Sequence, residues 1–134
     1  MNNTQTKTDI LFEKIFNIFH IIFLFSPILI YAIPPVYLKP YMKWFLLIVI
    51  LTPIHWKFFD NRCILTILSK KLFNSYQNTE TDSEFSETNL KWLYKPIMNI
   101  IGWEWNDMGL DKMVYLHWTI NILLVWFYTF YYAL

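Results

Sequence analysis

The three histidines of this sequence are the side chains with the clearest potential for chemistry. Each lies in or beside a strongly apolar run: His20 lies within the first run, His55 ends the second in TPIHW, and His117 begins the third in YLHW. Two histidines on separate helices can ligate a haem, and three imidazoles can bind a transition metal. If the runs are helices of one bundle, we expect all three imidazoles in its cytoplasmic half, with His55 and His117 at one depth and His20 one or two turns deeper. A haem or metal site is then one hypothesis.

Further polar side chains share helical faces with these histidines on a wheel of about 100° per residue. Polar groups inside an apolar helix usually face its neighbours, so these residues are candidates to orient the histidines or to form a proton relay with them. The simplest expectation is a structural role, in which the same groups hydrogen-bond across helices and no cofactor is bound. The residues concerned are Glu13, Asn17, Asn121 and Tyr128.

Cys63 is the only cysteine, so a disulfide within one chain and a Cys-based zinc or iron–sulfur site are excluded. It stands beside Arg62 at the expected start of an amphipathic helix next to the membrane. In that position a cysteine can be S-palmitoylated, and a lowered pKa would make it reactive. An incidental or structural role is the alternative.

Composition favours an integral membrane protein over a soluble domain. The 134 residues are 56% hydrophobic and 21% aromatic, and 16% are charged, against about 25% in ordinary soluble domains. The net charge of +1 gives no basic face for a nucleic acid. One domain at most is expected at this length.

The predicted fold is all-α, with three transmembrane helices at about 11–33, 41–59 and 113–134. A span needs roughly 20 apolar residues to cross a hydrocarbon core about 30 Å thick. The first run is longer than the apolar part of a signal peptide, so we expect it to be retained. Pro53 removes one helical hydrogen bond, and a neighbouring helix is expected to satisfy the freed carbonyl.

The long loop between the second and third spans is expected to contain one or two interfacial helices. Apolar residues recur on one face over about 62–76, which predicts a helix lying on the membrane surface. The polar, acidic stretch 77–89 has no periodicity and predicts a mobile linker. The apolar stretch 91–105 is interrupted by Pro96 and Gly102, so it predicts a second interfacial or re-entrant piece.

The distribution of basic residues predicts the orientation of the chain. Of the 11 Lys and Arg residues, only Lys39, between the first two spans, and Lys43, at the start of the second, lie on the side opposite to the N-terminus. Cytoplasmic segments carry an excess of Lys and Arg, so the N-terminus and the long loop are expected in the cytoplasm. The C-terminus is then expected on the opposite side of the membrane.

The segment HWKFFDNRCILTILSKKL, residues 55–72, resembles a pattern in small uncharacterised membrane proteins of large DNA viruses of algae and protists. Its Cys-x-Leu-Thr part also resembles a bacterial family of unknown function, with Ile64 in place of the usual proline and Ser69-Lys70 where a glutamate is usual. The resemblance implies a layout of a few spans and no known activity. It transfers no functional residue to this chain.

The sequence therefore predicts a non-enzymatic membrane protein that acts through contacts with lipid, with other membrane proteins or with a second copy of itself. Two alternatives stay open. One is a haem, metal or proton-relay site built from His20, His55 and His117. The other is a component of an oligomeric channel or transporter.

Overall fold

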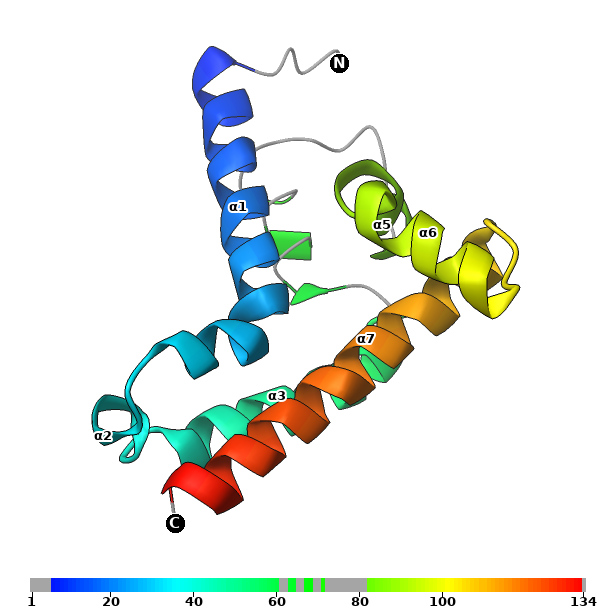
Figure 1. Cartoon of the computed structure of the whole chain (residues 1–134). Helices are drawn as coiled ribbons and strands as arrows, with labels where there is room; N and C mark the ends of the chain where they lie inside the picture. The colour runs from blue at the N-terminus through cyan, green and yellow to red at the C-terminus, as the bar shows by residue number, and fades with distance from the viewer. Residues whose placement is uncertain (1–5, 61–62, 65–66, 69–70, 72–81, 134) are drawn as a thin grey trace.

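The computed structural model describes residues 6–60, 63–64, 67–68, 71 and 82–133, and every regular element among them is a helix. The all-α prediction is confirmed for this part of the chain. Figure 1 shows the arrangement: α3 and α7 lie side by side, α1 crosses α7, and α5 and α6 pack over the beginning of α7. In this view the N-terminal half of α1 extends away from α7.

The first helix, α1, spans Lys7–Leu29 and continues into a 3-10 turn, η1, over Ile30–Ala32. Thr6 and Asp9 form a capping box at its start: the Thr6 hydroxyl accepts from the Asp9 N–H, and the Asp9 carboxylate accepts from the Thr6 N–H. Pro27 lies inside the helix and has no N–H to give to the Phe23 carbonyl. The Ser26 hydroxyl donates to that carbonyl instead, at 2.7 Å.

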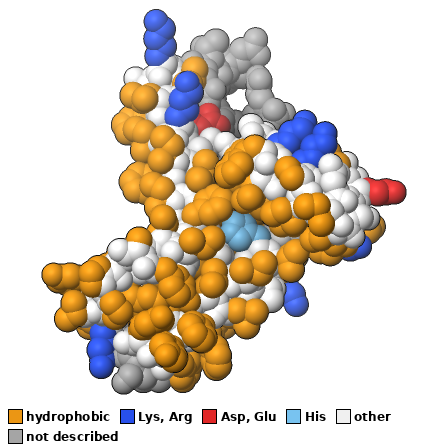
Figure 2. All heavy atoms as spheres, viewed as in Figure 1, with side chains coloured by type: hydrophobic (Ala, Val, Ile, Leu, Met, Phe, Trp, Pro, Cys, Tyr) orange, Lys and Arg blue, Asp and Glu red, His pale blue; other side chains and the backbone are white. Residues whose placement is uncertain are grey.

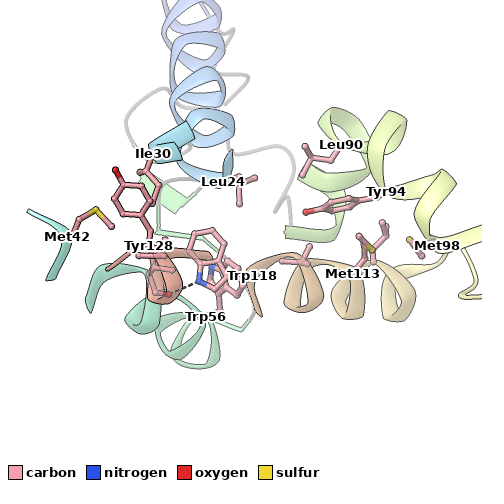
Figure 3. Packing of buried hydrophobic residues seen from close by; sticks show 14 residues of the cluster. Leu24, Ile30, Met42, Trp56, Leu90, Tyr94, Met98, Met113, Trp118 and Tyr128 are labelled. Carbon is pink, nitrogen blue, oxygen red and sulfur yellow. Dashed lines mark hydrogen bonds between the residues drawn. The ribbon is translucent and has the colours of Figure 1, made fainter. Parts of the chain in front are cut away.

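The second long helix, α3, spans Met42–Phe58 and follows a single short turn of helix, α2, at Pro35–Leu38. Pro53 lies inside α3 and leaves the Val49 carbonyl without its helical donor. The Trp118 indole N–H of α7 donates to this carbonyl at 2.7 Å, drawn as a dashed line in Figure 3. The prediction that a neighbouring helix satisfies the carbonyl freed by Pro53 is confirmed.

The region of the predicted acidic linker contains a helix, α5, over Asp82–Asn89, followed by α6 over Lys91–Ile101. A linker without structure was therefore the wrong expectation for 82–89. The buried Ser86 of α5 and the buried Leu90 that follows this helix fasten the region to the rest of the molecule. Residues 77–81 and most of the predicted interfacial helix 62–76 lie outside the described residues.

The last long helix, α7, spans Asp107–Tyr128 and continues as a π-helix, η2, over Thr129–Ala133. It begins earlier than the predicted residue 113. The Asn106 side chain caps it by accepting from the Gly109 N–H at 2.8 Å. The charged residues between this cap and residue 113 precede the apolar run, but they are already part of the helix.

Among the residues that the structure describes, two helices are long and apolar enough to cross a membrane, Lys7–Ala32 and Asp107–Tyr132, whereas three were predicted. The difference lies in α3, which has 17 residues and a length of about 25 Å at 1.5 Å per residue. The turn of α2 delays its start until Met42, and it ends at Phe58. This makes α3 shorter than the apolar run from which a span was predicted.

The buried apolar cluster follows α7 from one end of the molecule to the other (Figure 3). α7 contributes Leu110, Met113, Val114, Trp118, Val125 and Tyr128. The other members are Leu24, Ile30, Met42, Val49, Trp56, Leu90, Tyr94 and Met98. α7 is thus the helix against which the other elements pack.

The bond between Trp118 and Val49 can be tested with Trp118→Phe, which keeps an aromatic ring but removes the donor. A buried carbonyl left without a partner costs about 1–3 kcal/mol, so we expect the free energy of unfolding in detergent micelles to fall by that amount. In a Pro53→Ala chain the N–H of residue 53 can pair with Val49, and Trp118→Phe should cost clearly less. Equal losses in the two backgrounds would contradict this pairing. Trp126→Phe, at a half-exposed ring, is the control and should cost little.

Candidate functional site

His117 lies where three helices meet. Its Nδ1 is 2.6 Å from the Tyr94 hydroxyl of α6, and its ring is 5.4 Å from the Phe25 ring of α1, measured between centroids. The side chain is 9% exposed. A neutral imidazole with its proton on Nε2 accepts a hydrogen bond from Tyr94 in this geometry. His117 therefore connects α7 to α6 and packs against α1.

His55 has different neighbours at the end of α3. Its Nε2 accepts a hydrogen bond from the Ile64 backbone N–H at 3.3 Å, and its ring adjoins those of Trp56 and Phe59. Because Ile64 follows the turn after α3, this bond fixes the direction in which the chain leaves the helix. His55 is thus placed as a capping residue for the segment that begins at Cys63.

His20 is buried on the side of α1 that faces the other helices, with 5% of its surface exposed. Among the described residues, which include all three histidines, no group of three or more His, Cys, Asp or Glu side chains is placed to hold a metal ion. The three-imidazole metal site is therefore not assembled in this structure. Haem ligation by two histidines stays a hypothesis from the sequence.

Asn121 and Tyr128 hold α7 to α1 through backbone carbonyls. The Asn121 amide donates to the Leu24 carbonyl at 2.9 Å, and the Tyr128 hydroxyl donates to the Ile33 carbonyl at 3.1 Å. Tyr31 of η1 makes the reciprocal bond, donating to the Leu124 carbonyl of α7 at 2.8 Å. These contacts agree with the structural role expected for Asn121 and Tyr128. Another residue of this predicted group, Asn17, is half-buried on α1.

Three residues of this network were missed by sequence reasoning. Tyr94 and Trp118 are the partners of His117 and of the Val49 carbonyl, and Gly109 allows α6 to approach α7. A Cβ atom on Gly109 would collide with the Glu104 carbonyl and would lie 2.9 Å from the Met98 methyl. Pro53 could have pointed to a residue such as Trp118, because a proline inside a helix leaves a carbonyl that needs a donor from another helix.

Cys63 is 3% exposed, so its thiol is buried where the sequence predicted a surface position. Acylation requires the thiol to reach the active site of an acyltransferase, and it would therefore require this segment to move. Lipidation of Cys63 stays a prediction that this placement does not favour.

Comparisons with protein-family models, with curated proteins and with solved structures find no match to this chain. The resemblance to viral membrane proteins thus gains no relative and stays a prediction. The function must be argued from the geometry. That geometry consists of side chains that fasten α1, α3 and α6 to α7.

A double-mutant cycle on Tyr94 and His117 tests whether their contact stabilises the fold. Tyr94→Phe and His117→Phe each remove one partner, and we expect a coupling energy of about 1 kcal/mol between them in detergent unfolding. His55 has its own partner in Ile64, so Tyr94→Phe and His55→Phe should be additive. Additivity in the first pair as well would show that the contact between Tyr94 and His117 is not stabilising.

Proposed function

We propose that this chain is an integral membrane protein without enzymatic activity, which acts through contacts with lipid and with other membrane proteins. The observation that carries the proposal is an outer surface covered by large apolar side chains, while several polar side chains lie buried beside the apolar core. The buried side chains include six polar residues, His20, Thr52, Ser86, His117, Asn121 and Thr129. Large apolar side chains cover the outer surface, as the space-filling view shows for one face (Figure 2).

The two long apolar helices show most clearly that apolar side chains face outward beside buried polar ones. On α1, Phe19 is 63% exposed while the adjacent His20 is 5% exposed. On α7, Leu123 is 60% exposed while Asn121 is fully buried. A core helix of a soluble protein would bury most of its apolar residues, but only 22% and 39% of the most apolar windows of these two helices are buried. Lipid is the solvent that suits such a surface.

Contacts across the helices favour α1 as a retained span over a cleaved leader. The carbonyls of Leu24 and Ile33 accept hydrogen bonds from α7, and Tyr31 donates one in return. Removing α1 would leave the Asn121 amide buried or exposed to lipid without an acceptor. Such a loss is costly where water is absent.

We further propose that α3 is a third, shorter crossing beside α7. Its 17 residues lie at the lower limit of about 17–25 for a span, and its outer side chains are apolar, with Ile48 51% and Leu51 48% exposed. The Lys and Arg distribution then supports a cytoplasmic N-terminus and a C-terminus on the opposite side.

Membrane integration is tested by placing a charge on the outward side of α7. An aspartate near the centre of a span costs about 2.5–3.5 kcal/mol of insertion free energy, so Leu123→Asp should increase the fraction of protein released from membranes by alkaline carbonate. Leu123→Ala is the matched control and should stay in the pellet. Release of the unmodified chain by carbonate would refute the proposal.

Orientation is tested with single cysteines in a Cys63→Ala chain. A membrane-impermeant maleimide should label Lys39→Cys, in the turn between α1 and α3, in intact cells. It should label Lys95→Cys on α6 only after permeabilisation, because the two positions lie on opposite sides of the bilayer. The reverse pattern, or equal labelling of both cysteines in intact cells, would contradict the proposed topology.

A further inference from the structure

Helix α6 presents three distinct faces. On a wheel of about 100° per residue, Leu90, Tyr94 and Met98 form the buried face, each 1% exposed. A polar flank carries Lys91, Lys95 and Asn99, which are all exposed. An apolar flank carries Trp92, Pro96 and Ile100, and the partly buried Leu93 and Ile97 continue it towards the core.

The apolar flank is among the most exposed apolar surface of the molecule. Ile100 is 86% exposed and Trp92 is 70% exposed, and the nearby Met108, in the first turn of α7, is 68% exposed. The Trp92 indole N–H donates to the Asn89 carbonyl at 3.1 Å, which holds the ring in a fixed direction. Side chains of this size gain nothing from facing water, so the flank needs an apolar environment.

The buried face fixes α6 against α7, so the apolar flank cannot turn inward. Tyr94 is hydrogen-bonded to His117, and Met98 packs at Gly109, where α6 and the following turn come close to α7. Gly102 ends α6 in the left-handed region at φ 83°, and Asn106 begins α7. In the proposed membrane topology α7 starts at the bilayer edge, so α6 lies at that edge too.

We propose that the apolar flank of α6, Trp92, Pro96 and Ile100, is inserted at the boundary between lipid headgroups and acyl chains, with Lys91 and Lys95 in the headgroup layer above it. This inference rests on the proposed membrane function. The combination is typical of an interfacial helix, which places its apolar side about 5–10 Å into the membrane and its lysines towards water. Lys91 also lies over the Trp105 ring, with Nζ 5.9 Å from the centroid.

The local charge indicates that neutral lipid is sufficient for this contact. The three lysines at this end of the molecule, Lys91, Lys95 and Lys112, are outnumbered by four carboxylates, Glu87, Glu104, Asp107 and Asp111. An excess of positive charge, which would select anionic lipid, is therefore not formed by these residues. The partner is the phosphatidylcholine interface, and insertion depends on the apolar side chains.

The test measures the depth of nitroxide labels by electron paramagnetic resonance in liposomes of pure phosphatidylcholine. Labels are placed at Ile100→Cys on the apolar flank, at Asn99→Cys on the polar flank and at Leu123→Cys on the outer side of α7, each in a Cys63→Ala chain. If Cys63→Ala unfolds the protein, Cys63 is retained, because its thiol is 3% exposed and shielded from the label. Oxygen, which partitions into lipid, and a water-soluble nickel chelate are the two relaxing agents.

We expect Leu123 to lie deep in the hydrocarbon and Ile100 to lie about 5–10 Å below the phosphate level. The Asn99 label should be readily accessible to the nickel chelate. The Ile100 label would overturn the inference if it were as accessible to nickel as the Asn99 label, or if it were shielded from both agents by a protein partner. If the Leu123 label were also in water, the membrane proposal itself would fail, so the two failures are distinguishable.

Discussion

Two prolines each leave a backbone carbonyl, four residues earlier, without its helical donor. The need to give these carbonyls a hydrogen-bond donor is the constraint on which the rest of this structure depends. Pro27 in α1 and Pro53 in α3 each remove one N–H donor from a helix. In water the freed carbonyl would bind solvent, but in the proposed lipid setting only another protein group can satisfy it. Ser26 serves the Phe23 carbonyl from within α1, and Trp118 serves the Val49 carbonyl from α7.

This requirement is one reason for the central place of α7, which supplies the donor for the Val49 carbonyl. α7 contains no proline, and several of its side chains bond to the neighbouring helices. Trp118 binds α3, Asn121 and Tyr128 bind the backbone of α1 and the residues after it, and His117 binds Tyr94 of α6. These polar groups lie inside the bundle beside its apolar core, while many large apolar side chains face outward.

The sequence was sufficient for the features that depend on one helix at a time. Periodicity placed Asn121 and Tyr128 on a face that meets another helix, and Pro53 predicted a donor from a neighbour. Prediction from the sequence failed for features that depend on how the helices pack against one another. His20, His55 and His117 share a general location in the apolar runs, yet Tyr94 and Ile64 give two of them separate partners, which a wheel for one helix cannot show. The helix α5 was missed because its sequence has no apolar periodicity, and its end is held by packing of Ser86 and Leu90 in the interior.

The most direct test of this account is a solid-state nuclear magnetic resonance measurement of the bond between Trp118 and Val49 in liposomes. With ¹³C in the valine carbonyls and ¹⁵N in the tryptophan indoles, a donor–acceptor distance of 2.7 Å predicts strong dipolar dephasing of one valine carbonyl signal. That dephasing should disappear in Trp118→Phe while the protein stays folded and inserted. A folded, inserted protein whose valine carbonyl signals show no dephasing that depends on Trp118 would contradict the central claim.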